Sequence, residues 1–138
     1  MTGVEMGYEQ ERQEAIQAGQ EALRSLQLAK DDLKSAKNWG VLDILGGGLV
    51  TNIIKHSKME KAKVHMERAK WNLEHFGREL QDVANYVELD LNTTDFLNFA
   101  DYFFDGFIAD LAMQSRIHQA REQVDEAIRQ VEYALNRL

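Results

Sequence analysis

Apolar residues recur at alternating intervals of three and four along three stretches of this sequence. In the first, widened by Ile16 and Leu23, they are Ala15, Gly19, Ala22, Leu26, Ala29, Leu33 and Ala36. In the second they are Met59, Ala62, Met66, Ala69, Leu73, Phe76, Leu80, Val83 and Val87. In the third they are Ile117, Ala120, Val124, Ala127, Val131, Ala134 and Leu138. This spacing predicts three helices, each with one apolar seam and a length of about 30 residues or more, roughly 45–55 Å.

Alanine recurs at every seventh position within the first and third seams. Small side chains on a seam let helix axes approach to near the low end of about 8–10 Å. The chain also contains no proline, which permits long uninterrupted helices. We therefore expect a tightly packed, elongated, antiparallel all-α bundle that leaves no room for a cofactor between its helices.

The chain also aligns with itself at an offset of 58 residues, with the seams in phase. Residues 43–74 then lie over residues 101–132, with six identities: Asp43/Asp101, Gly48/Gly106, Ser57/Ser115, Ala62/Ala120, Ala69/Ala127 and Glu74/Glu132. Either a duplicated helical hairpin or a chance match between two amphipathic helices accounts for this similarity. Under duplication, each unit is a short apolar helix, a glycine break and a long helix.

The short helices are expected near Trp39–Leu45 and Asp95–Asp105. Thr94 or Thr93 is a candidate N-cap for the second, because a threonine hydroxyl accepts a free backbone N–H. The three consecutive glycines at 46–48 are interpreted as a corner between helices. The predicted fold is one domain, residues 1–138, with three long helices running up-down-up and two short helices covering the ends.

Composition narrows the functional classes. The absence of cysteine excludes a disulfide framework, a thiolate zinc site and a cysteine nucleophile. The first residues, MTGVEMGYEQERQEA, lack the pattern of a signal peptide. The longest weakly charged run, residues 39–54, has 16 residues, short of the roughly 20 that span a membrane. These features predict a soluble cytoplasmic protein.

Charge is distributed unevenly along the chain. The net charge of −7 argues against nucleic acid as a partner. Residues 51–70 carry six Lys or Arg and two Glu, whereas residues 79–110 carry eight acidic residues and no basic one. The two regions are either separate binding surfaces or, as we favour, faces that cancel each other across the fold or across a dimer.

No motif for catalysis or for a cofactor emerges. The glycines do not fit a phosphate loop, because no strand precedes them and Lys55 follows Gly48 by seven residues. The four histidines (His56, His65, His75 and His118) are not placed for a carboxylate-bridged metal site and are expected at the surface. We expect no enzymatic activity, no bound metal and no cofactor.

Two apolar residues lie opposite the second seam, where a solvated helix should be polar. Val64 and Trp71 are seven residues apart, and with Trp39 they are candidate partner-binding residues. Isolated exposed apolar side chains are the competing interpretation. If three helices leave a groove open, a second copy of the chain can close it, so a homodimer is the expected oligomer.

The segment from Gly46 to Lys58 allows a different function. Its apolar residues with Lys55, His56, Ser57 and Lys58 could contact an anion or a membrane surface. Burial of the apolar residues and a polar helix face are the interpretations we favour. Three acidic residues in the corresponding part of the second unit, Asp101, Asp105 and Asp110, would be repelled by anionic lipid.

The stretch Asn38-Trp39-Gly40, followed by an Asp, the glycine triplet and Lys55-His56-Ser57-Lys58, resembles the core of an uncharacterised bacterial helical-bundle family. The resemblance covers residues 35–83. It implies a helical protein and assigns no catalytic residue. The function expected from the sequence is therefore that of a non-enzymatic interaction or scaffold protein that binds itself and another protein. The alternative is peripheral membrane or anionic-ligand binding through Gly46–Lys58.

Overall fold

The computed structural model describes the backbone of residues 3–46, 49–103 and 114–138, and the side chains of residues 3, 5–34, 60–103 and 118–138. This part of the chain forms four helices and no strand. They are α1 (Gly3–Gly46), α2 (Leu49–Ala84), α3 (Thr93–Tyr102) and α4 (Gln114–Leu135). The prediction of an all-α bundle is confirmed.

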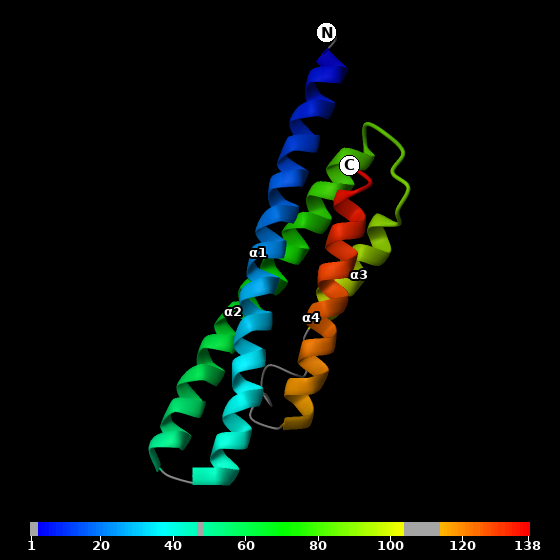
Figure 1. The fold of residues 1–138 in the computed structure, drawn as a ribbon. Helices are drawn as coiled ribbons and strands as arrows, with labels where there is room; N and C mark the ends of the chain where they lie inside the picture. Colours follow the sequence, from blue (N-terminus) through cyan, green and yellow to red (C-terminus); the bar gives the residue numbers. More distant parts are fainter. Residues whose placement is uncertain (1–2, 47–48, 104–113) are drawn as a thin grey trace.

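The helices alternate in direction along one long axis (Figure 1). α1 descends from the N-terminus, α2 returns beside it, the short α3 descends, and α4 returns, so the topology is up-down-up-down. α1 packs along α2 over the greatest length, α4 packs against α1, and α3 packs against α2. The reversal between Gly46 and Leu49 agrees with the corner predicted at the glycine triplet.

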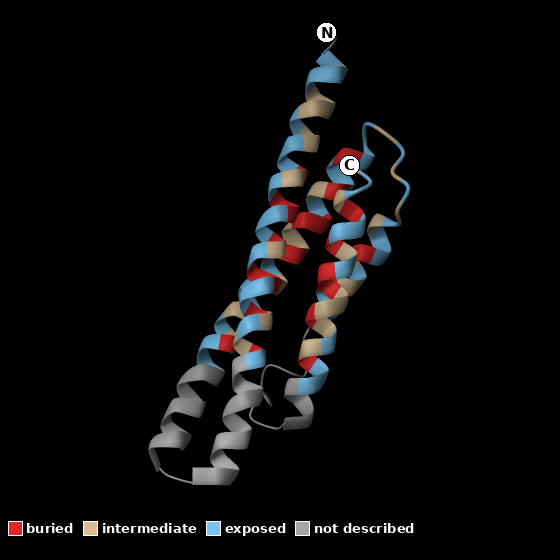
Figure 2. Ribbon diagram, viewed as in Figure 1, coloured by how far each residue is buried: buried red, intermediate tan, exposed pale blue. Residues whose placement is uncertain are grey.

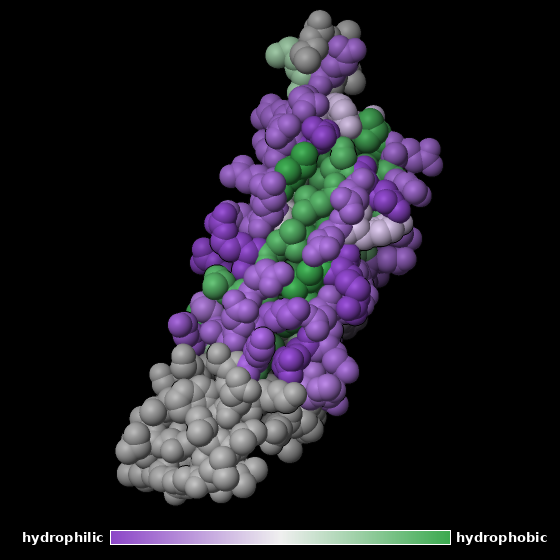
Figure 3. Space-filling view, viewed as in Figure 1, coloured by the Kyte–Doolittle hydropathy of each residue, from purple (hydrophilic) through white to green (hydrophobic). Residues whose placement is uncertain are grey.

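The predicted seams form the core (Figure 2). Every described seam residue of the first helix is buried, and in α2 the residues from Ala62 to Val83 on the seam are fully buried. The seam of α4 is buried from Ala120 to Ala134. Between α1 and α4 a continuous apolar strip with polar flanks is visible (Figure 3). Half-buried leucines, including Leu23 and Leu135, pack against the core, and Leu135 of α4 lies against Gly19 of α1.

The expectation of a separate short helix at Trp39–Leu45 is wrong, because α1 runs without interruption to Gly46. Gly40 inside this helix costs about 1 kcal/mol relative to alanine, which is too little to end a helix in a chain without proline. The duplicated hairpin stays a prediction. The segment before the glycines belongs to the 44-residue α1, whereas its counterpart, α3, has 10 residues.

The second short helix exists but differs from the prediction. Its N-cap is Asn92, whose side chain accepts a hydrogen bond from the backbone N–H of Asp95 (3.0 Å), rather than Thr93 or Thr94. α3 does not cover an end of the bundle. It lies along α2, where Phe96, Ala100 and Phe103 enter the core. The Phe76 and Phe96 rings meet edge to face, with centroids 5.4 Å apart.

One further expectation about the long helices needs correction. α2 ends at Ala84, so Val87 lies in the following turn and is only half-buried, rather than on the helical seam. α4 has 22 residues and follows directly on residues outside the described ranges, so a third helix of about 30 residues stays a prediction. The described residues form two long helices, a helix of intermediate length and a short one.

Candidate docking surface

Val64 and Trp71 lie on the outer face of α2, opposite its buried seam. Their exposed fractions are 60% and 58%, which is high for side chains this apolar. Leu28 of α1, 45% exposed, lies near Val64 because both line the same hollow. The sequence placed Val64 and Trp71 on the outside correctly, and the hairpin adds Leu28 to them.

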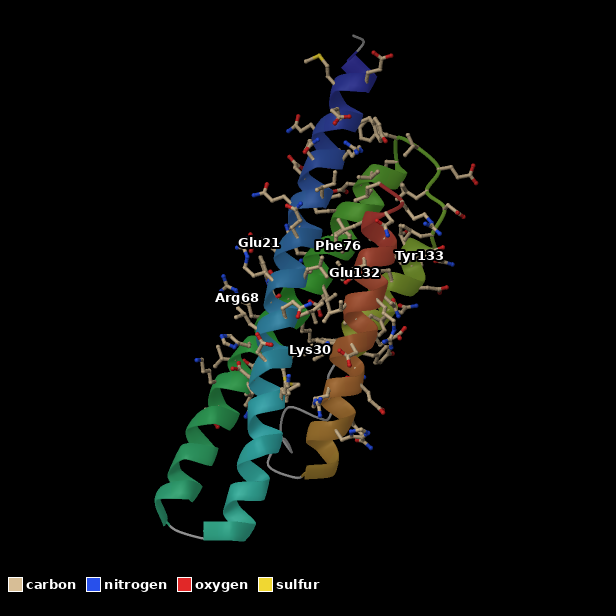
Figure 4. All side chains as sticks on the ribbon, in the orientation of Figure 1. Glu21, Lys30, Arg68, Phe76, Glu132 and Tyr133 are labelled. Atoms are coloured by element: carbon tan, nitrogen blue, oxygen red, sulfur yellow. The ribbon has the colours of Figure 1, made fainter. Side chains whose placement is uncertain are left out.

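A groove between α1 and α2 connects these residues. One hollow of about 380 Å³ is lined by residues that include Leu28 and Val64. A second, of about 430 Å³, lies farther along the same pair of helices and includes Trp71. Both share Glu21, Arg68 and Asn72, so they form one continuous surface. Figure 4 shows Glu21 and Arg68 projecting from the outer side of the bundle, away from α4. We call this surface the α1–α2 groove.

The floor of the groove is closed by a buried polar contact between the two helices. Asn72 of α2 donates a hydrogen bond from Nδ2 to Oγ of Ser25 on α1 at 3.0 Å, and both residues are more than 90% buried. The Ser25 hydroxyl in turn donates to the backbone oxygen of Ala22 (3.0 Å). A buried polar pair on a helical seam fixes the register of the two helices, and here it places Trp71 beside the groove.

Trp71 is also oriented from its own helix. Its ring stacks on His75, one turn farther along α2, with centroids 5.5 Å apart and planes 18° from parallel. The stacking restricts the indole rotamer, so less side-chain entropy is lost when a partner covers the ring.

Three carboxylates meet at the upper end of the groove. Oxygen atoms of Glu11 and Glu14 on α1 and of Glu79 on α2 lie within 4.8 Å of one another. The Oε2 atoms of Glu11 and Glu79 are shielded from solvent and accept no hydrogen bond within the described residues. We call Glu11, Glu14 and Glu79 the carboxylate cluster.

Burial and mutual repulsion perturb this cluster. Desolvation raises the pKa of Glu11 above its ordinary value, and the charges of Glu14, Asp82 and Glu79 raise it further. Desolvation is also the main cause of the raised pKa of Glu79, while His75, with Nε2 at 3.9 Å from Oε1, acts in the opposite direction. Carboxylate oxygens are ligands for hard cations, so the residue types fit a cation, and the expectation of no bound metal stays a prediction.

The histidines follow the expectation only in part. His118 is well exposed, at 69% of its side chain. His65 is instead 25% exposed, and its Nδ1 contacts Oδ2 of Asp32 across α1 and α2. The hairpin register brings these two residues together, which the spacing of histidines within one helix could not reveal.

The oppositely charged regions of the sequence begin at different ends of α2. The basic region occupies the beginning of α2, whereas the acidic region begins near its end and continues into α3. α3 then runs back along α2 (Figure 1), and residues 104–110 of the acidic region lie outside the described residues. Cancellation of the two charges across the fold or across a dimer therefore stays a prediction.

The remaining candidate residues lie outside the described side chains. They are Trp39, Lys55, His56, Ser57 and Lys58, so contact with a partner, an anion or a membrane through them stays a prediction. Within the described residues, no helix is both long enough and apolar enough to cross a membrane. A comparison with models of protein families finds no match to this chain, and searches of curated proteins and of solved structures find no match either.

Proposed function

We propose that the protein is a non-enzymatic docking protein that binds polypeptide along the α1–α2 groove, both a second copy of itself and another protein. The single observation behind this proposal is the exposure of Trp71 beside Val64 and Leu28 along one continuous groove. Tryptophan, like tyrosine and arginine, is enriched among the side chains that dominate binding energy at interfaces. Leaving this much apolar surface in water has a cost that a partner would remove.

The form of the groove supports binding of polypeptide rather than chemistry on a small molecule. It is open along two helices, and its floor is closed by the Ser25–Asn72 hydrogen bond. Small-molecule sites are more enclosed and hold a few convergent polar groups. A helix laid between α1 and α2 would cover Leu28, Val64 and Trp71 together, as in other helix-in-groove complexes. The cytoplasm is the proposed compartment, because a chain without cysteine gains nothing from an oxidising one.

The first test is native co-purification of the tagged full chain, with mass spectrometry of the proteins that elute in stoichiometric amount. It is run on the unmodified chain, on Trp71→Ala and on a matched control, Tyr133→Ala. Tyr133 is likewise an exposed aromatic, at 49%, but belongs to α4 and lines a different hollow. We expect Trp71→Ala to lose bound polypeptide and Tyr133→Ala to retain it.

Two results of this experiment would contradict the proposal. Equal retention by Trp71→Ala and Tyr133→Ala places binding elsewhere than in the α1–α2 groove. A chain that elutes without any polypeptide and sediments as a monomer contradicts the docking function altogether. Flotation of the chain with anionic liposomes would then favour the alternative function through Gly46–Lys58.

A further inference from the structure

Two oppositely charged residues of α2, Lys61 and Glu79, lie at nearly equal distances on either side of Trp71. Lys61 and Glu79 are 18 residues apart, which is about five full turns at 3.6 residues per turn. They therefore lie on the same side of α2, about 27 Å apart along its axis at 1.5 Å per residue. The midpoint of this interval is residue 70, next to Trp71.

Neither the carboxylate cluster nor Lys61 has all of its polar partners among the described residues. Glu79 belongs to the carboxylate cluster, in which two buried oxygens accept no hydrogen bond from a described residue. Lys61 is exposed and forms no ion pair with any described residue. A cation brought to the cluster would reduce the repulsion among its three carboxylates. Lys61 cannot reach the cluster of its own chain, because about 27 Å along α2 separates it from Glu79.

We propose that the occupant of the α1–α2 groove is a second copy of this chain, packed antiparallel about a two-fold axis that crosses α2 at the level of Trp71. Such an axis places Lys61 of each copy beside the carboxylate cluster of the other. It also brings the two Trp71 rings together at the centre, with Val64 of each copy about 10 Å from its own Trp71 along α2. This inference rests on the proposed function, since it names the partner for the same groove.

The positions of the described charges select the antiparallel orientation. Lys61 and the carboxylate cluster are separated along α2, with Trp71 between them. A parallel pair would place Lys61 against Lys61 and one carboxylate cluster against the other, and like charges together are costly at an interface. An antiparallel pair places Lys61 of each copy against the carboxylate cluster of the other.

The first test is an exchange of charges, read by analytical ultracentrifugation at low salt. Lys61→Glu and Glu79→Lys should each weaken dimerisation at least about tenfold, because each puts like charges opposite one another. The double variant K61E/E79K restores the opposite pairing in this arrangement and should recover the dimer. Circular dichroism melting checks that each variant is folded. A double variant as weak as the single ones overturns the proposal.

The second test uses the absence of cysteine from the chain. In the variant K61C/E79C the two sulfurs of one chain are too far apart for a disulfide, which needs Cα atoms within about 7 Å. Oxidation should therefore give a covalent dimer, as should a mixture of the two single-cysteine variants. K61C alone should stay uncoupled. Coupling of K61C to itself indicates a parallel pair and overturns the proposal.

The failure of this inference and the failure of the proposed function give different results. If the chain is monomeric and K61C/E79C does not couple, the antiparallel dimer is wrong. The docking function nevertheless stands if a different protein is retained by the unmodified chain and lost from Trp71→Ala. If Trp71→Ala changes neither self-association nor retention of another protein, the groove itself is not a docking surface.

Discussion

The edge-to-face contact between Phe76 and Phe96 gives the sharpest test of the position of α3, which the sequence placed differently. Phe76 of α2 is fully buried and Phe96 of α3 is 5% exposed. Replacing a buried phenylalanine with alanine costs about 3–5 kcal/mol, so Phe76→Ala should lose that much stability. An edge-to-face pair contributes about 0.5–1.5 kcal/mol beyond burial. The double variant F76A/F96A should therefore cost less than the sum of the single variants by about that amount.

The measurement is urea unfolding of the four chains, followed by circular dichroism, with thermal melting as a second probe. For a chain of this size 1 kcal/mol corresponds to roughly 3–4 °C, so each single variant should melt about 10 °C or more below the unmodified chain. The control is Tyr102→Ala, which removes an aromatic ring from the same helix at a position 71% exposed. It should change stability by no more than about 0.5 kcal/mol. A loss below about 1 kcal/mol for Phe96→Ala, with additive single variants, would show that α3 does not pack on α2.

Three further predictions follow from particular contacts. Gly19→Ala should lower stability, because its new Cβ would lie 2.6 Å from Cδ2 of Leu135 and 3.0 Å from Cε1 of Phe76. Overpacking costs about 1–3 kcal/mol, which is more than alanine gains in helix propensity. The control is Gly3→Ala, which has open space around it and should not lower stability in the same melting assay. Ser25→Ala should destabilise more than Asn72→Leu in urea unfolding, because it leaves the buried Asn72 amide with only a 3.4 Å bond to the Glu21 carbonyl, while the leucine removes the polar group itself. The raised pKa of Glu79 means that folding favours the protonated form of its carboxyl group. The stability that this group contributes is therefore fully present at pH values below the ordinary pKa of glutamate. It is lost as pH rises through the raised pKa of the folded state. Glu79→Gln should therefore reduce the loss of stability between mildly acidic and mildly alkaline buffer, and an unchanged pH profile would contradict the perturbed pKa.

The sequence predicted the buried seams because a helical seam depends only on spacing within one helix. The sequence did not predict the end of the first helix, because glycines occur at two nearby places. Gly40 and the glycine triplet both suggest a break, but only the triplet coincides with the end of a helix. The side position of α3 depends on where Phe96 and Leu97 find space beside Gly77, because a Cβ at that position would lie 2.5 Å from Cδ2 of Leu97. No pattern within ten residues contains that information.

The groove could have been predicted in greater part. In a hairpin whose first helix ends at Gly46 and whose second begins at Leu49, residues at similar distances from these helix ends lie close together. Glu14 precedes Gly46 by 32 residues and Glu79 follows Leu49 by 30. Asp32 precedes Gly46 by 14 residues and His65 follows Leu49 by 16. The carboxylate cluster and the contact between Asp32 and His65 therefore follow from the turn and the helix lengths. The exposed conformation of Trp71 and its stacking on His75 needed the structure.

The order in which α1 meets its partners has a consequence for folding during synthesis. α1 contacts both α2 and α4, and α4 begins about 70 residues after α1 ends. Helical hairpins with local contacts form fast, so α1 and α2 can pair while α4 is still inside the ribosome. At synthesis rates of about 5–20 residues per second, the side of α1 that α4 later covers stays open to water for seconds. A nascent chain released before α4 would carry this open apolar side permanently, so truncation within α4 should yield an aggregating hairpin rather than a smaller folded protein.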